Sequence, residues 1–486
     1  MKEVKKFAFD IGWVFISSVV TLIISFLLSI VLARWLGASD LGLYRMVITI
    51  QGIGALITTF GIPVAVIKYV AEYKNDEDTL TQTLFSALVS SIIFGIGVFF
   101  LLYMLSGALA SVFKMPELAR LIKILSLVFP FTSILETLLG LLNGIRKIKK
   151  FAFLMILRQL LMILFIVAFV KIGYGINGAV WGIVLSAAGG CLVGIFITRN
   201  FLHLKPYYFV QNAKKLISFG SKVFGANTLA LILTQADIII LGYFLTAKDV
   251  GYYSIAVTLS NFFLLVPRAI LRITYPATSE YWSQKNHQKL QKMIEKSVKY
   301  SACILIPAGL GAAFFCNEII STLFGKEFIY AALPFYVLLI ARVINGSIEL
   351  PIGGSLSGIG RPDLPLKIDI VSAVTNIGLN IILIPHYGIL GAAIATAISL
   401  MMATSLSLTF IIRILAVKID FKWYMRAAVY TLVAIIPFLL GKNLVNPFIV
   451  GIIILCIYVV LIYLIFLTKD DKSLIMSLAY SLIFRK

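Results

Sequence analysis

The chain has 486 residues, of which 60% are hydrophobic and 13% are charged, and its mean hydropathy is +1.02. Because soluble globular proteins are about half apolar and about a quarter charged, this composition excludes a soluble enzyme, a disordered tail and a secreted disulfide scaffold. It indicates a membrane protein with many spans of about 20 residues each. The net charge of +21 agrees with the positive-inside rule and with anionic lipid headgroups, and we expect no nucleic-acid partner.

Apolar segments of membrane length recur along the whole chain. We expect each to be helical, because lipid offers the backbone no hydrogen-bond partner. The sequence predicts an all-α polytopic membrane protein with 14 transmembrane helices, at residues 11–33, 46–70, 83–105, 120–142, 151–170, 177–198, 222–245, 252–274, 299–320, 331–352, 366–384, 389–413, 426–442 and 447–467.

The basic residues between these segments predict the orientation of the chain. With a cytoplasmic N-terminus and residues near span ends counted with the adjoining loop, the cytoplasmic side holds 31 of the 42 Lys and Arg residues and the outer side holds 9, while Arg158 and Arg342 lie inside spans. We therefore expect a multi-pass protein of the cytoplasmic membrane with both termini in the cytoplasm. Residues 275–299 and 473–486 contain amphipathic stretches, and we expect helices on the inner membrane surface there.

Three joints between predicted spans recur in the sequence at almost one offset. The matching pairs are 36–44 with 245–253, 174–179 with 387–392, and 143–145 with 357–359, at offsets of 209, 213 and 214. An ordered recurrence of this kind indicates an internal repeat. We expect two six-helix lobes in parallel repeat at residues 1–205 and 206–418, followed by 419–486 with two extra spans and a cytoplasmic amphipathic tail.

These joints also resemble those of a known family. Residues 33–37 and 40–44 resemble the first-hairpin signature of polysaccharide flippases, and residues 360–396 are similar to the span 11–12 motif of the same family. The resemblance is to the fourteen-span polysaccharide-flippase branch of the multidrug/oligosaccharidyl-lipid/polysaccharide exporter superfamily. It implies movement of undecaprenyl- or dolichyl-linked sugars from the inner to the outer leaflet. Lipid II flippases typically carry an Arg-Asp pair in the first span, whereas residues 25–29 here are uncharged, which argues against a peptidoglycan precursor as the cargo.

Basic residues inside the predicted spans are candidates for binding the phosphate of such a cargo. Ionisable groups at membrane depth are costly and are functional candidates by default, and arginine binds phosphate bidentately while it stays charged. We predict a substrate-binding set that consists of Arg158, Arg268, Arg272, Arg342 and Lys68. Two alternatives stay open: Arg158 pairs with Glu136 for structural reasons only, and Arg272 and Lys68 extend toward the inner headgroups.

A second set of polar residues suits a small cation or a proton. Asp237 lies among apolar residues of the seventh span, Asn376 and Asn380 share one face of the eleventh, and Thr396 follows in the twelfth. One carboxylate with several neutral oxygens suits Na⁺, and Asp237 alone suits a proton. Some relatives resemble this arrangement with an acidic residue where Asn380 stands, so the asparagine favours proton coupling or no coupling. The alternative is an Asp–Asn hydrogen bond that only joins two spans.

The sequence contains no GxxxxGK[ST] nucleotide-binding loop, no nucleophile elbow and no HExxH motif, so we expect neither an enzyme nor a resident cofactor or metal. The prediction is a flippase that translocates a lipid-linked oligosaccharide by alternating access for polysaccharide or glycan biosynthesis. Its expected partners are that oligosaccharide and membrane lipids. We expect a monomer, with contact to glycan-assembly enzymes as a further expectation. The alternatives are a multidrug exporter of the same superfamily and a membrane-bound glycan polymerase or transferase.

Overall fold

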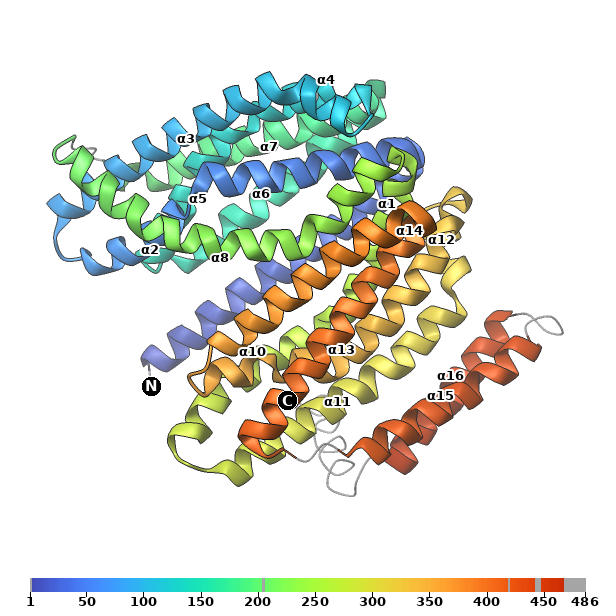
Figure 1. Cartoon of the computed structure of the whole chain (residues 1–486). Coiled ribbons are helices and arrows are strands. Elements are labelled where there is room, and N and C mark those ends of the chain that lie inside the picture. The colour runs from blue at the N-terminus through green and yellow to red at the C-terminus, as the bar shows by residue number, and fades with distance from the viewer. Residues whose placement is uncertain (1, 203–205, 418–419, 442–446, 467–486) are drawn as a thin grey trace, which may run out of the picture. The chain divides into compact units, whose positions relative to one another are not determined.

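The computed structural model describes residues 2–202, 206–417, 420–441 and 447–466, and within these ranges every regular element is a helix (Figure 1). The chain divides into two compact units. The first comprises Met1–Ile255 together with Ile384–Ile389, and the second comprises Ala256–Leu383 together with Leu390–Lys486.

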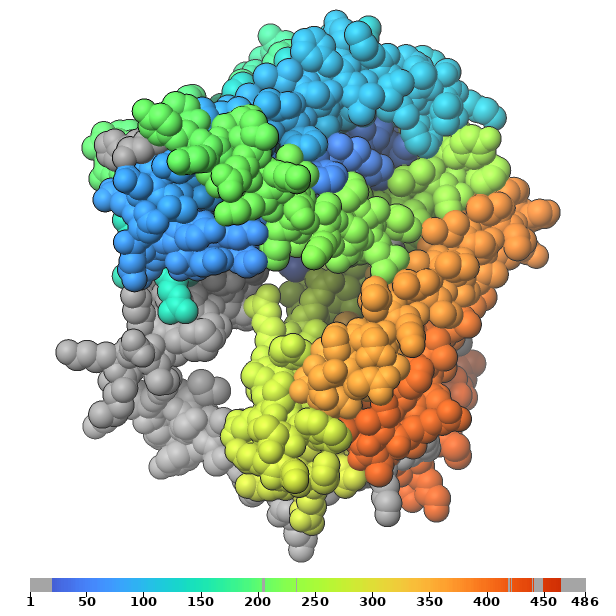
Figure 2. Space-filling view, turned by 60° about the vertical axis from the view of Figure 1, so that its left-hand side comes forward, coloured from blue at the N-terminus to red at the C-terminus, as the bar shows by residue number. Residues whose placement is uncertain are grey.

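Long apolar helices and a few shorter ones build the first unit. They are α1 (Lys2–Thr59), α2 (Ile62–Glu72), α3 (Glu77–Val112), α4 (Pro116–Ser126), α5 (Val128–Gly144), α6 (Ile148–Phe169), α7 (Gly175–Thr198), α8 (Phe209–Phe244) and the first part of α9 (Ala247–Ser260). Short polar or glycine-containing joints separate them. At one such joint Asp76 caps α3, because its carboxylate accepts a hydrogen bond from the Thr79 backbone N–H at 3.0 Å. In Figure 2 the green surface of α8 lies along the blue surface of α2 and α3, with which it packs.

The second unit contains most of the remaining helices. They are α10 (Leu265–Ser283), α11 (His287–Phe314), α12 (Cys316–Leu323), α13 (Ala332–Gly358), α14 (Asp363–Leu415) without its residues 384–389, α15 (Phe421–Gly441) and α16 (Pro447–Leu461). α15 and α16 lie side by side and contact α11 (Figure 1).

Seven helical stretches among the described residues are long and apolar enough to cross a membrane, and the number rises to nine if each of two bent pairs forms one span. The predicted all-α polytopic membrane fold is confirmed at this level, whereas the count of 14 spans stays a prediction. The two counts differ because some stretches are far longer than one span. Ile148–Phe201 has 54 residues, which corresponds to about 80 Å of helix against a hydrocarbon core of about 30 Å.

Glycines bend these long stretches at the joints that the sequence repeat marks. Gly175 has φ 53° and ψ −140°, and Gly388, 213 residues later, has φ 58° and ψ −137°. This backbone conformation is open essentially to glycine alone. At another joint Arg146 and Gly360, 214 residues apart, both have positive φ, of 56° and 84°. The sequence repeat is therefore also a repeat of backbone conformation at these joints.

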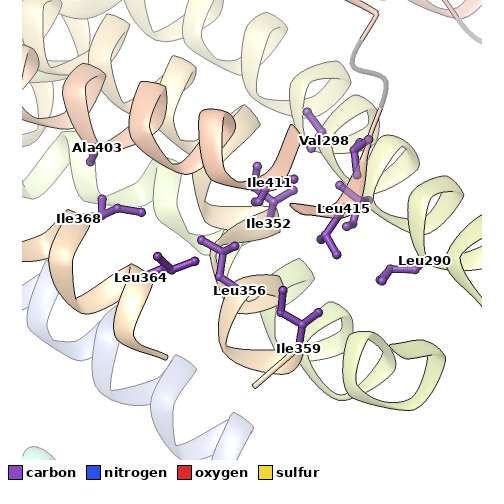
Figure 3. Packing of buried hydrophobic residues seen from close by; sticks show 12 residues of the cluster. Leu290, Val298, Ile352, Leu356, Ile359, Leu364, Ile368, Ala403, Ile411 and Leu415 are labelled. Atoms are coloured by element: carbon purple, nitrogen blue, oxygen red, sulfur yellow. The ribbon is translucent and has the colours of Figure 1, made fainter. Parts of the chain in front are cut away.

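A cluster of buried apolar side chains joins three helices of the second unit (Figure 3). Leu290, Ile294 and Val298 recur every four residues on α11, so they share one face. They pack with residues of α13 and α14 such as Ile352 and Ile411, and all five side chains are at most 2% exposed. This face therefore anchors the beginning of α11 in protein.

The packing of α11 corrects one expectation from the sequence. The sequence predicts a helix on the membrane surface within residues 275–299, but α11 runs without a break from His287 to Phe314, and its first turns pack against α13 and α14. An apolar face at helical spacing has the same pattern whether it covers protein or lipid, which explains the error. The second predicted surface helix, at residues 473–486, lies outside the described residues.

Candidate functional site

An ion pair inside the first unit contains one of the predicted substrate-binding residues. Arg158 on α6 donates from Nη1 to the Glu136 carboxylate on α5 at 2.8 Å, and the two side chains are 31% and 33% exposed. The next residue, Gln159, donates to the Ser25 hydroxyl of α1 at 3.1 Å. Polar groups from three helices thus meet here. About a third of each side chain of the pair is not covered by protein.

Lys68 is exposed on α2 and is held by aromatic rings. Its Nζ lies 4.8 Å from the ring centre of Tyr69 and 4.7 Å from that of Phe219 on α8. Such cation–π contacts attract an ammonium group without neutralising it. The charge of Lys68 thus remains available to an anion, and the rings fix its position.

The three other predicted cations lie on packed helices of the second unit. Arg268 and Arg272 are exposed on α10, and Arg342 is half-buried on α13. α10 and α13 pack against each other. One turn along α13 from Arg342, Asn345 donates to the Thr404 hydroxyl on α14 at 3.1 Å and to the Glu349 carboxylate at 3.3 Å. The five predicted substrate-binding residues are therefore divided between the units: Lys68 and Arg158 lie in the first, and the other three in the second.

The predicted coupling residues divide in the same way. In the second unit Asn380 donates to the Asn376 side-chain oxygen at 3.0 Å, and Asn376 donates weakly to the Thr396 hydroxyl at 3.4 Å. The structure therefore brings these three residues together within α14, on the two sides of the bend at Gly388. Asp237 lies on α8 in the first unit and accepts a hydrogen bond from the Tyr253 hydroxyl of α9 at 2.8 Å.

Sequence analysis missed two residues whose polar contacts join α8 to other helices. One is Tyr253, which is fully buried, and the other is Gln235, whose side-chain oxygen accepts a hydrogen bond from the Thr49 hydroxyl of α1 at 3.1 Å. Tyr253 was within reach of the sequence, because it ends the repeated joint 245–253, in which Tyr44 is its equivalent. Gln235 has no such signal, because its partner lies 186 residues away.

The arginine in the motif of residues 360–362 has a structural role in the loop between α13 and α14. Arg361 donates from Nε and Nη2 to both carboxylate oxygens of Asp363, each at 2.9 Å. These hydrogen bonds raise the pKa of the Arg361 guanidinium above its usual value. The pair is exposed, so it orients the loop and contributes little to stability.

The second unit contains an apolar cavity of about 800 Å³ that the sequence did not reveal. Side chains of α11, α12, α13, α14 and α15 line it, including Leu310, Val343, Leu408 and Leu432. Asn317 and Glu318 are among its few polar residues. Its walls come from five helices between residues 306 and 438, so no local pattern could predict it.

Among the described residues, no group of three His, Cys, Asp or Glu side chains could hold a metal ion. The described helices carry cations at partly or fully exposed positions, the buried amides of Asn376 and Asn380, and an apolar cavity. The described part of the chain thus combines a polytopic membrane fold with these cations, these polar oxygens and this cavity.

Residues 31–333, more than half of the chain, match the protein family described as "Polysaccharide biosynthesis protein". The chain belongs to this family, and the resemblance to polysaccharide flippases is confirmed. The chain is 27% identical over 393 residues to the probable low-salt glycan biosynthesis flippase Agl15 of Haloferax volcanii, with 80% of each chain covered.

Solved structures share the fold. The inward closed conformation of the lipid II flippase MurJ matches with a TM-score of 0.76 and 17% identity, covering 94% of this chain and 99% of that chain. An inward-facing multidrug resistance transporter of the MATE family matches with a TM-score of 0.67 and 16% identity, covering 82% of this chain and 94% of that chain. The prediction that the chain is not an enzyme is confirmed by these relatives, which are flippases and transporters.

Proposed function

We propose that this chain is a flippase that moves a lipid-linked oligosaccharide from the inner to the outer leaflet by alternating access. The observation that carries the proposal is the family match over residues 31–333. Arg158 lies within that range, in an ion pair that a phosphate can reach. The names of the relatives, a glycan biosynthesis flippase and a lipid II flippase, support the same class of cargo.

The proposed topology has fourteen spans, with lobes at residues 1–205 and 206–418 and two extra spans in 419–486. It is supported by the positive-φ glycines that divide the longest helices at Gly37, Gly175 and Gly388. The proposed location is the cytoplasmic membrane with both termini inside. A thiol placed at Asn75 or Lys149 should then resist an impermeant reagent in intact cells, whereas a thiol at Asp249 should react.

The cations are proposed to bind the phosphate or pyrophosphate of the cargo. Arg158 pairs with a carboxylate, and a phosphate can accept the same charge-assisted hydrogen bonds while carrying more charge. Glu136 therefore holds the guanidinium in place until the cargo displaces the carboxylate. The same phosphate group would be held by Arg268, Arg272 and Arg342 while the transport path closes on the inner side of the membrane and opens on the outer side. Lys68 would attract it electrostatically from an exposed position.

The polyprenyl chain of the cargo has a suitable partner in the apolar cavity of the second unit. The walls of this cavity consist mainly of aliphatic and aromatic side chains, so they favour hydrocarbon. A volume of about 800 Å³ is enough for several isoprene units, and the rest of the chain would stay in the bilayer.

Coupling to an ion gradient is part of the proposal. Asp237 would carry a proton, and Asn376, Asn380 and Thr396 are the proposed oxygen ligands of Na⁺. A further part is that the protein acts as a monomer and contacts glycan-assembly enzymes that make or consume the cargo.

The multidrug exporter is the second candidate, because the fold also matches a MATE transporter. The charge of the candidate residues argues against it, since a cationic drug requires acidic groups and the candidate set contains four arginines and a lysine. The polymerase or transferase has no support among the named relatives.

The proposal is tested by depleting the protein in its own cells and following lipid-linked glycan. If the protein is a flippase, lipid-linked oligosaccharide should accumulate in the inner leaflet of the depleted cells, while extracts of these cells still transfer sugars normally. Loss of sugar transfer in the extract would instead identify a transferase, and unchanged lipid-linked glycan would contradict the proposal.

A further inference from the structure

Two glycines at equivalent positions of the internal repeat bring α1 and α9 into backbone contact. Gly42 and Gly251 are 209 residues apart, as are Ala38 and Ala247. The carbonyl oxygen of Ala247 lies where a Cβ of Gly42 would have to be, and the carbonyl oxygen of Ala38 lies where a Cβ of Gly251 would have to be. The contact is thus reciprocal: the glycine of each helix faces an alanine carbonyl oxygen of the other helix.

A reciprocal contact of this kind is what a two-fold relation between the two repeated segments produces. Both glycines are buried. A Cβ on Gly42 would lie 2.9 Å from the Gly251 nitrogen, and a Cβ on Gly251 would lie 3.3 Å from the Gly42 nitrogen. Any side chain at either position would force the helices apart. The contact consists of Cα–H groups facing carbonyl oxygens, which are individually weak interactions. It is therefore close-fitting but easy to separate.

The charges around the contact favour its formation. A helical segment begins after the break at Gly37, where φ is 77° and ψ is −177°, and α9 begins at Ala247. The contact therefore joins two helix N-termini, whose partial positive charges repel. Asp40 and Asp249 occupy equivalent positions in the two first turns, and the Asp249 carboxylate accepts from the Thr246 hydroxyl at 2.6 Å. These carboxylates offset the repulsion between the helix ends.

We propose that the contact between Gly42 and Gly251 is the outer seal of the transport path, formed while the path is closed to the outside and separated when it opens. The proposal rests on the proposed function and topology, which put both joints on the outer side of the membrane. α1 and α9 belong to different repeats. A rotation that moves the outer end of one repeat away from the other would therefore separate this contact. The glycines let it close at backbone distance, and the absence of side chains between the two lets it open without breaking an ion pair.

A reporter cysteine on the opposite helix tests the seal without any cargo. Ser254 lies one turn beyond Gly251, is 4% exposed and differs from cysteine by one atom. In a chain whose four native cysteines are replaced, S254C should react slowly with an impermeant thiol reagent added outside. Gly42→Ala should accelerate the reaction about tenfold, because it destabilises the closed state. Gly97→Ala is the matched control, since its Cβ would meet nothing within 4 Å, and it should leave the rate unchanged.

Equal labelling rates in Gly42→Ala, Gly251→Ala and Gly97→Ala would overturn the seal. If the glycine variants do not reach the membrane, cysteines at Ala38 and Ala247 joined by a short thiol cross-linker replace them. The cross-linked protein should lose flipping and regain it when the link is cleaved, and full flipping in the linked state would contradict the proposal. Labelling that responds to Gly42→Ala in a protein that flips no lipid-linked sugar would refute the proposed function and leave the seal in place.

Discussion

Two polar groups among the helices differ in charge and in exposure. The Arg158–Glu136 pair is charged, and its side chains are about one third exposed, whereas Asn376 and Asn380 are neutral and only 6% and 0% exposed. The difference follows from desolvation, because a fully enclosed ion pair must recover the large cost of leaving water. At these two places the charged pair is the more exposed and the amide pair is the enclosed one. The first arrangement suits a charged cargo, and the second suits contact between helices or a small ion.

The largest expected effect separates a binding role of Arg158 from a structural one. Arg158→Ala should lower flipping by about tenfold or more, since a hydrogen bond to a charged group contributes about 1.5–3 kcal/mol. Arg158→Lys should restore part of the rate, because lysine keeps the charge but loses the bidentate geometry. Glu136→Gln should retain most of the activity, since it leaves the guanidinium available. If Glu136→Gln impairs flipping as much as Arg158→Ala does, the pair is structural.

Asp237 provides the next test, which concerns coupling. Asp237→Asn keeps the shape of the side chain and removes its charge, so transport should lose its dependence on the ion or proton gradient. Tyr253→Phe removes the hydrogen bond of 2.8 Å but leaves the carboxylate, so coupling should persist in that variant. The measurement is uptake of lipid-linked sugar with and without an imposed gradient. Gradient-driven transport by Asp237→Asn equal to that of the parent would make Asp237 a structural residue.

Asn380 tests the enclosed side of the comparison. Asn380→Ala leaves the Asn376 side-chain oxygen without its 3.0 Å donor, and an unpaired buried polar group costs about 1–3 kcal/mol. The melting temperature of the purified protein should therefore fall by several degrees. Arg158→Ala, at a partly exposed site, should change it much less. A larger fall in melting temperature for Arg158→Ala than for Asn380→Ala would contradict a cargo-binding role of Arg158 and a structural role of Asn380.

The smallest expected effect lies outside the spans. Hydrogen bonds from the Thr79 side chain and backbone hold the pKa of Asp76 below its ordinary value of 3.8. The stabilisation is therefore complete above about pH 4 and is lost as the pH falls through the lowered pKa of the folded state. Asp76→Asn should melt slightly below the parent at pH 7, and the difference should shrink below pH 4. A difference that stays constant down to pH 3 would exclude the carboxylate as its source.

The sequence predicted the helical class and the joints well, because both depend on local chemistry. Apolar segments must be helical in lipid, and Gly175 and Gly388 are required by backbone conformations that other residues avoid. The pairing of Arg158 with Glu136 was also foreseen as an alternative, since both lie at one depth of adjacent spans.

The remaining features depend on which helices meet, which local patterns do not contain. The contact of Gln235 with Thr49 and the walls of the apolar cavity join segments far apart in the chain. The packing of Leu290, Ile294 and Val298 has the same cause, because only their neighbours on α13 and α14 distinguish a protein-covered face from a membrane-surface helix.

The central claim is that cations in the spans carry a lipid-linked phosphate sugar across the membrane. The most direct measurement is flipping of a fluorescent polyprenyl-pyrophosphate sugar in proteoliposomes that contain the purified protein. The parent and Arg413→Ala, which removes an exposed arginine at the end of α14, should flip it at equal rates. The triple variant Arg158→Ala, Arg268→Ala, Arg342→Ala should flip it no faster than empty vesicles. Parental flipping by the triple variant would contradict the account.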